Sequence, residues 1–252
     1  DVYFYRGSEK IAKEVNEYLE DEFDNITDII GYQPYFKTKI FLYNSIAELQ
    51  QSNVGIGNGT FTPGGETQFV KPYIEVANPG SIASLKEELL TKVSALMVNE
   101  MMFGGNLKDM FQSAVLLNLP EWFISGAALY VAKGWSIEMD DFARQLIENR
   151  NPQKFKKLSG RDAALAGQSL WNFIAQKYGK SNISNILNYT RIIRSEEKSL
   201  AITLGVTFDQ LMLEWQYFYI DNAKQVEQNY VNPRVENILA GKRNRKGIFY
   251  NE

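Results

Sequence analysis

The chain has 252 residues, 44% of them apolar and 13% aromatic, which is enough for one large folded domain or two small ones. Its net charge of −3 leaves no basic excess for binding phosphates, so a nucleic-acid function is disfavoured. Cysteine and histidine are both absent, which excludes disulfides, thiol nucleophiles, serine–histidine catalysis and zinc sites built from thiolate or imidazole. An enzyme would have to use carboxylates, lysine, tyrosine and hydroxyl groups.

The order of the expected elements indicates an α+β fold, with strands early in the chain and helices late. The N-terminal part predicts a strand at 2–5, a helix at 9–30 stopped by Gly31, a central strand at 37–43, a short helix through 47–49, a hairpin at 59–70 and a strand at 73–76. From Ser81 onward the apolar spacing predicts helices at 82–103, 107–117, 120–133, 138–149, 161–178, 182–193 and 207–229.

Other sites and segments are weaker signals. The most apolar stretch, 115–132, is interrupted by Asn118, Pro120 and Glu121, so no membrane span is predicted. Acidic clusters at 21–24 and 138–141 lack the spacing of a calcium loop, and the glycines of 55–65 do not form a phosphate-binding motif. The basic run at 241–246 predicts a linker into a further domain, with an anchor for anionic lipid or nucleic acid as the alternative.

Three segments of the helical part carry a recognisable pattern. Residues 119–130 read LPEWFISGAALY, residues 167–179 read GQSLWNFIAQKYG, and residues 200–215 contain a Leu-Gly pair and end in Glu-Trp. Periodicity alone would explain them as helices of a packed core. In this order, however, the segments resemble the L-P-x-W-F-x-E-G-x-A-x-Y helix and the downstream segments of the peptidase-MA-like (gluzincin) metallopeptidases. The resemblance covers residues 37–219 and is closest to exported bacterial proteins in which such a domain precedes a Tol-type β-propeller.

This resemblance implies a zincin-like fold, with a small mixed sheet and helices in the N-terminal part, a mainly helical lobe after it and a cleft between them. In active members two histidines of a His-Glu-x-x-His helix and a glutamate of the W-F-x-E-G helix bind zinc, and the first glutamate is the general base. Aligned on the Gly-Gly that follows the helix, those positions fall on Thr91, Lys92, Ala95 and Ser125. None of these side chains can perform the corresponding role, so we expect no metal, no cofactor and no peptidase activity.

A second alignment places the motif on 99–103 and keeps its glutamate as Glu100, but it moves the ligand positions to Asn99 and Phe103 on the last helical turn. In the first alignment Lys92 puts a cation where the metal would lie. A buried cation needs a partner, so we expect Lys92 to contact a carboxylate or to extend into the former cleft. A catalytic lysine with a lowered pKa is the alternative.

The expected function is therefore a catalytically inactive peptidase-like domain that binds or scaffolds proteins in the bacterial cell envelope. It would comprise residues 1–240, divided into an α+β part at 1–80 and a helical part at 81–240, with 241–252 as a linker. We expect an exported protein, periplasmic, outer-membrane-associated or extracellular, that belongs to a longer multidomain chain because Asp1 is not an initiator methionine. Its edge strand, formed by Tyr73, Ile74, Glu75 and Val76, could bind a peptide by strand addition. The alternatives are a structural domain that positions a C-terminal β-propeller and an enzyme that uses carboxylates, Lys92 or Tyr130.

Overall fold

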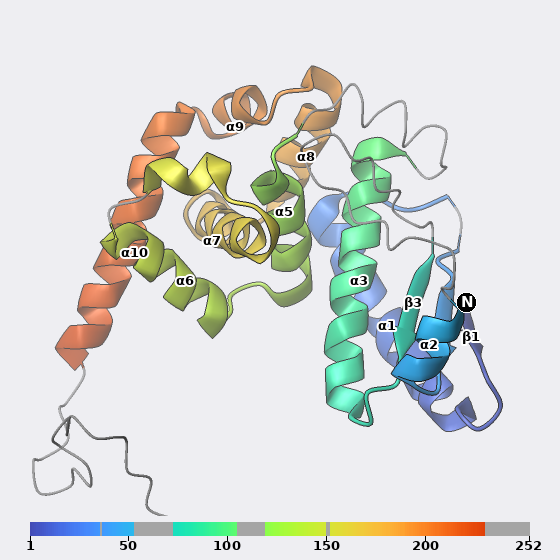
Figure 1. The fold of residues 1–252 in the computed structure, drawn as a ribbon. Helices are drawn as coiled ribbons and strands as arrows, with labels where there is room; N and C mark the ends of the chain where they lie inside the picture. Colours follow the sequence, from blue (N-terminus) through green and yellow to red (C-terminus); the bar gives the residue numbers. More distant parts are fainter. Residues whose placement is uncertain (36, 53–72, 105–118, 150–151, 230–252) are drawn as a thin grey trace, which may run out of the picture.

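A small parallel sheet lies at one side of the molecule and a cluster of helices lies at the other (Figure 1). The structure is a computed structural model that describes residues 1–35, 37–52, 73–104, 119–149 and 152–229. The strands β1 (Val2–Phe4), β2 (Ile40–Tyr43) and β3 (Ile74–Ala77) form a sheet in the order β1-β2-β3. The α+β class and the central position of β2 are thus confirmed. All three strands are parallel, so the described part of the sheet is not the mixed one that we expected.

The sheet is buried against two long helices, α1 (Glu9–Ile30) and α3 (Ile82–Phe103), which pack against each other and against β1 and β3 respectively. Alternate strand residues enter the shared core, because successive side chains of a strand point to opposite faces. The buried strand residues of this core are Ile40, Leu42, Ile74 and Val76. The short helix α2 (Ile46–Ser52) contacts β2 and β3.

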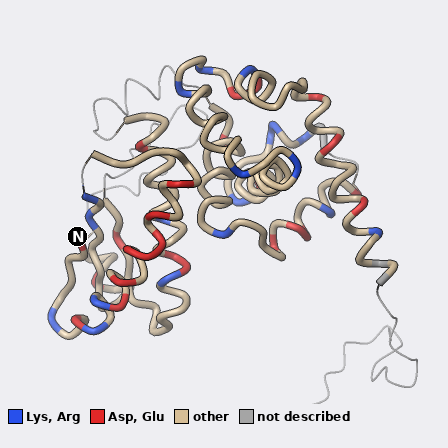
Figure 2. Tube along the Cα trace, turned by 180° about the vertical axis from the view of Figure 1, so that it is seen from behind, with Lys and Arg blue, Asp and Glu red and all other residues tan. Residues whose placement is uncertain are grey.

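The helix α1 ends where the sequence predicts. Gly31 adopts the left-handed conformation, with φ of 65°, and its N–H donates to the carbonyl of Thr27 at 2.8 Å. The solvent-facing side of α1 is strongly acidic, since its 22 residues include eight aspartates and glutamates and two lysines. Figure 2 shows these acidic residues gathered in the N-terminal part of the molecule, which disfavours contact with a polyanion there.

The rest of the described chain is helical. It contains α5 (Glu121–Lys133), α6 (Ile137–Glu148), the 3₁₀ helix η1 (Pro152–Lys157), α7 (Gly160–Tyr178), α8 (Ser181–Ile193), α9 (Glu196–Leu204) and α10 (Phe208–Asn229). We did not predict α9 or η1. The helix expected at 107–117, the hairpin expected at 59–70 and the tail at 241–252 lie outside the described residues. Within the described ranges, no helix combines the length and the apolar character that crossing a membrane requires.

The helices α5 and α7 meet backbone to backbone at two glycines. A Cβ atom added to Gly126 would lie 2.4 Å from the Cα of Gly167, and one added to Gly167 would lie 1.9 Å from the carbonyl oxygen of Trp122. The indole of Trp171 donates to the carbonyl of Phe123 at 3.0 Å across the same crossing. This contact fixes the position of α5, the helix that carries Ser125, relative to the helical core.

Buried hydrogen bonds join α7 to α10. The hydroxyl of Tyr219 donates to the carbonyl of Ser169 at 3.0 Å and accepts from the amide of Asn172 at 3.2 Å. The indole of Trp215 donates to the hydroxyl of Ser169 at 3.1 Å. Because Trp215 and Tyr219 are fully buried, these bonds select one register of α10 on α7.

Candidate functional site

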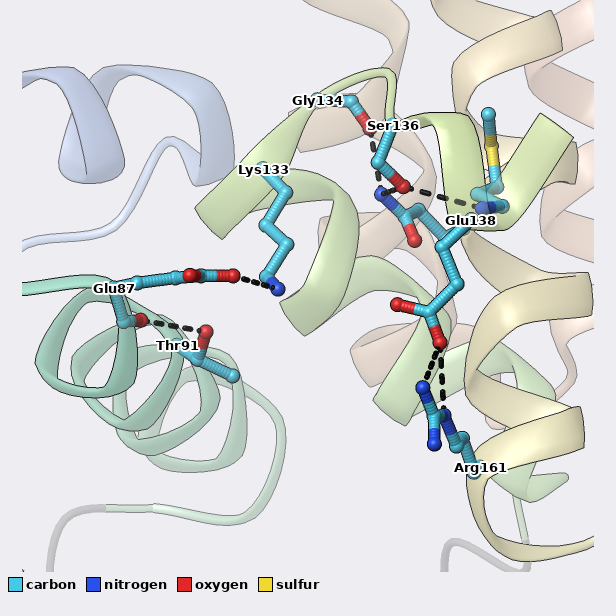
Figure 3. A network of polar contacts seen from close by, with 9 residues as sticks. Glu87, Thr91, Lys133, Gly134, Ser136, Glu138 and Arg161 are labelled. Carbon is cyan, nitrogen blue, oxygen red and sulfur yellow. Dashed lines mark hydrogen bonds and ion pairs between the residues drawn. The ribbon is translucent and has the colours of Figure 1, made fainter. Parts of the chain in front are cut away.

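The positions that the resemblance singles out lie along the seam between α3 and α5. These two helices run in opposite directions (Figure 1), and an ion pair between Glu87 and Lys133 joins them at one end (Figure 3). Eight residues farther along each helix, about 12 Å at 1.5 Å per residue, stand Ala95 and Ser125. Thr91 lies halfway between Glu87 and Ala95 on the same side of α3. The fold therefore brings Thr91, Ala95 and Ser125 to one seam.

The donor set of this seam does not fit a zinc ion. Ala95 has no donor atom, and the Thr91 hydroxyl is engaged with the carbonyl of Glu87 at 2.9 Å (Figure 3). Zinc prefers imidazole, thiolate and carboxylate ligands, which a serine hydroxyl cannot replace. Among the described residues, no group of three or more acidic residues is placed to hold a metal ion. What the seam offers is a row of small, half-buried side chains.

Lys92 points away from this seam, toward the sheet. Its ammonium group forms an ion pair with Glu88 at 2.8 Å and donates to the backbone carbonyl of Glu75 in β3 at 2.7 Å. The side chain of Lys92 is 40% exposed and that of Glu88 is 43% exposed, so the pair lies at the surface rather than in the core. The expectation that Lys92 would find a carboxylate is confirmed.

The sheet explains why a carbonyl of β3 is within reach of Lys92. The N–H of Ile74 donates to Lys39 and that of Asn78 donates to Tyr43, so the even-numbered residues of β3 direct their backbone groups toward β2. Glu75 lies between them, and its carbonyl points to the opposite side, where Lys92 meets it. The strand expected at 73–76 is thus observed one residue later, at the end of the described sheet, and its outer carbonyl is bonded to α3.

The alternative alignment leads to a different environment. Glu100 lies on the last turn of α3, where burial raises the pKa of its carboxyl group. Its charge helps to raise the pKa of the Tyr32 hydroxyl, after the larger effect of burial, which places Glu100 near the end of α1. The amide of Asn99 donates to the carbonyl of Ala95 within α3 at 2.7 Å. Asn99 and Glu100 therefore do not form a pair of ligands facing α5.

Tyr130, the other residue considered for new chemistry, is 8% exposed in α5. Burial raises the pKa of its hydroxyl group, which makes it a weaker acid than free tyrosine. Within the part of the chain that the structure describes, no hydrogen bond links Tyr130 to Lys92. The two do not form an acid–base pair.

The turn after α5 is held in one conformation by α7 (Figure 3). The side-chain amide of Gln168 donates to the carbonyl of Gly134 at 2.9 Å and to the hydroxyl of Ser136 at 3.3 Å. Ser136 in turn accepts from the N–H of Met139 at 3.2 Å and so caps α6. This turn fixes the end of α5 from which Lys133 reaches Glu87.

Three contributors to this region were not identified from the sequence. Glu88 was detectable, because it stands four residues before Lys92 on a predicted helix, the spacing of a helical ion pair. The pair of Glu87 and Lys133 and the role of Gln168 depend on helices that are far apart in sequence, and no local pattern indicates them.

Comparison with protein-family models, curated proteins and solved structures gives no match to this chain. The site is therefore described by its own geometry: a seam of small side chains between α3 and α5, and beside it a lysine–glutamate pair at the outer side of β3.

Proposed function

We propose that the chain is a catalytically inactive, zincin-like domain that binds a protein or peptide ligand as a scaffolding module of the bacterial cell envelope. The observation that carries this proposal is the placement of Lys92. The resemblance assigns this position to the general base of a peptidase, and here it holds a cation that is committed to Glu88 and to β3. A protonated lysine cannot accept a proton from a metal-bound water.

The exposure of Lys92 favours a binding function over a purely structural one. A lysine covered by packed side chains would indicate a filled cleft, whereas this one is 40% exposed. An ammonium group has three N–H donors, and two of them are used by Glu88 and Glu75. The third can donate to a carbonyl or carboxylate of a ligand that lies along the surface between α3 and β3.

Charge and resemblance support the rest of the proposal. The acidic side of α1 disfavours nucleic acid as the ligand. The envelope location is supported by the similarity of three segments to exported bacterial proteins.

The test combines a cleavage screen with a binding screen. The purified chain would be incubated with a broad peptide library, with and without added zinc, and the library would also be panned for binders. We expect no cleavage, and we expect peptides whose affinity falls at least about tenfold in Lys92→Glu. Lys86→Glu is a matched control, because Lys86 lies on the same helix and forms a similar ion pair with Glu14 at 2.9 Å.

The outcomes separate the candidate functions. Zinc-dependent cleavage that is lost on chelation would contradict the proposal and support an active peptidase. Absence of any binder would support the structural alternative, a domain that positions a neighbouring β-propeller. Equal loss of binding in Lys92→Glu and Lys86→Glu would indicate a general effect of charge and remove Lys92 from the site.

A further inference from the structure

The helix α10 is apolar on two opposite sides, and the helices around it cover only one of them. Its inner side buries Leu211, Trp215 and Tyr219 against the helical core. On its outer side Leu213 is 54% exposed and Tyr217 is 69% exposed. A helix with two apolar sides is expected to be covered on both, because an exposed apolar strip of this kind marks an interaction site.

The outer side of α10 continues into a groove against the end of α7. The groove has a volume of about 530 Å³ and is lined by Phe173 and Lys177 of α7 and by residues 214–224 of α10. Its floor is aromatic, since the ring of Phe173 lies 5.3 Å from that of Phe218. Its rim carries two lysines, Lys177 and Lys224, and two acidic residues, Glu214 and Asp221.

The spacing of the outer residues indicates the shape of the occupant. Leu213, Tyr217, Ile220 and Lys224 follow one another at intervals of four, three and four residues, which is the repeat of a seam between two packed helices. A seam of this kind fits a helix lying lengthwise along α10. An extended peptide or a compact small molecule would not use a strip three turns long.

We propose that the occupant is α10 of a second copy of this chain, packed antiparallel across a two-fold axis that passes between Tyr217 and Ile220. In such an interface each residue meets a different residue of the other copy, so Tyr217 faces Ile220 and Leu213 faces Lys224. The aliphatic stem of Lys224 covers Leu213, and its ammonium group lies beside Glu214 of the other copy.

The charges of the rim select this direction. An antiparallel pair separates the two Lys224 side chains by eleven residues of helix, about 16 Å, and sets each beside an acid. A parallel pair would place Lys224 against Lys224 and Asp221 against Asp221, and each such contact is repulsive. The balance of two lysines and two acids suits a surface that pairs with itself.

The first experiment measures the mass of the chain by analytical ultracentrifugation over a series of concentrations. We expect a monomer–dimer equilibrium whose Kd rises at least about tenfold in Tyr217→Glu and in Ile220→Glu. Ile192→Glu is the control, since Ile192 is 71% exposed on α8 and lies outside the groove. A monomer at every concentration, or a dimer that responds equally to all three substitutions, would overturn the proposal.

The second experiment tests the direction of the helices and does not depend on weakening the contact. The chain contains no cysteine, so single cysteines can be introduced without a background of other thiols. Leu213→Cys mixed with Lys224→Cys should form a disulfide-linked heterodimer under mild oxidation, because facing residues are within bridging distance. Leu213→Cys alone should not, because its two copies lie about 16 Å apart along the axis. Efficient crosslinking of Leu213→Cys with itself, or none in the mixture, would refute the antiparallel pair.

Discussion

The contact of α5 with α7 should be intolerant of a single methyl group. A Cβ atom at residue 167 would lie 1.9 Å from the carbonyl oxygen of Trp122, whereas such a contact ordinarily measures about 3.3 Å. Because both sides of the contact are backbone, no side chain can rotate to relieve it. In Gly167→Ala the two helices must therefore separate by about 1.4 Å, the difference between these two distances.

The cost of this separation exceeds the gain in helix propensity. A gap of this size forfeits about half of the dispersion energy of each affected atom pair, and overpacking with backbone shifts costs about 1–3 kcal/mol and occasionally more. With no side chain to yield, we take about 4 kcal/mol, against which alanine regains about 1 kcal/mol over glycine within a helix. The net loss of about 3 kcal/mol corresponds to a fall in Tm of about 6–12 °C for a chain of this size.

The assay is urea and thermal unfolding of Gly167→Ala beside the wild-type chain. Gln145→Ala provides the control, because Gln145 is exposed on α6 and its loss should change the free energy of unfolding by no more than about 0.5 kcal/mol. Gly126→Ala should also be destabilised, since its Cβ would lie 2.4 Å from the Cα of Gly167. If Gly167→Ala is as stable as the wild type, the two helices do not meet at their backbones and the reasoning fails.

Three further substitutions test other contacts. Lys133→Ala should lower the free energy of unfolding by less than about 1 kcal/mol, and the loss should shrink at high salt in urea titrations, because the glutamate of its pair with Glu87 is 63% exposed. Burial raises the pKa of Glu100, so the folded chain holds that proton more tightly than the unfolded chain and stability falls as the pH rises above the unfolded value of 4.5. Glu100→Gln should therefore have a higher Tm than the wild type at neutral pH and an equal one below that value, and a constant difference across the pH series would contradict this. Tyr219→Phe loses the buried bond to the carbonyl of Ser169 and should cost about 1–3 kcal/mol, so an unchanged urea midpoint would show that the bond contributes nothing.

The fold class was predictable because its two periods are distinct in the sequence. Alternating apolar residues mark β2 and β3, and the 3.6-residue period marks α1 and α3. Helix ends were predicted within one residue where a strong stop signal exists, as at Gly31, which adopts the left-handed conformation. The boundaries of β3 shifted by one residue because pairing with β2, rather than local propensity, defines them.

The elements and contacts that were not predicted depend on tertiary structure. The helix α9 has nine residues, of which only Ser199 and Leu200 are buried, so its periodic signal is weak. The bond from Lys92 to Glu75 joins residues 17 positions apart through the register of a sheet. Gly126 and Gly167 read in the sequence as two costs in helix propensity, and only the crossing of α5 and α7 reveals their purpose.

The backbone contact at the two glycines also determines which parts of the molecule can move. Helices that meet without intervening side chains have no soft layer to deform, so α5 and α7 should turn as one body and their central amides should exchange with solvent most slowly. The seam between α3 and α5 is held at one end by a partly exposed ion pair and is lined by small side chains, which makes it the softer boundary. A hinge motion would therefore open along this seam, with Lys92 and β3 on one side and Ser125 on the other. A ligand that spans both sides would close the hinge, and its binding energy would be coupled to the angle between the two halves.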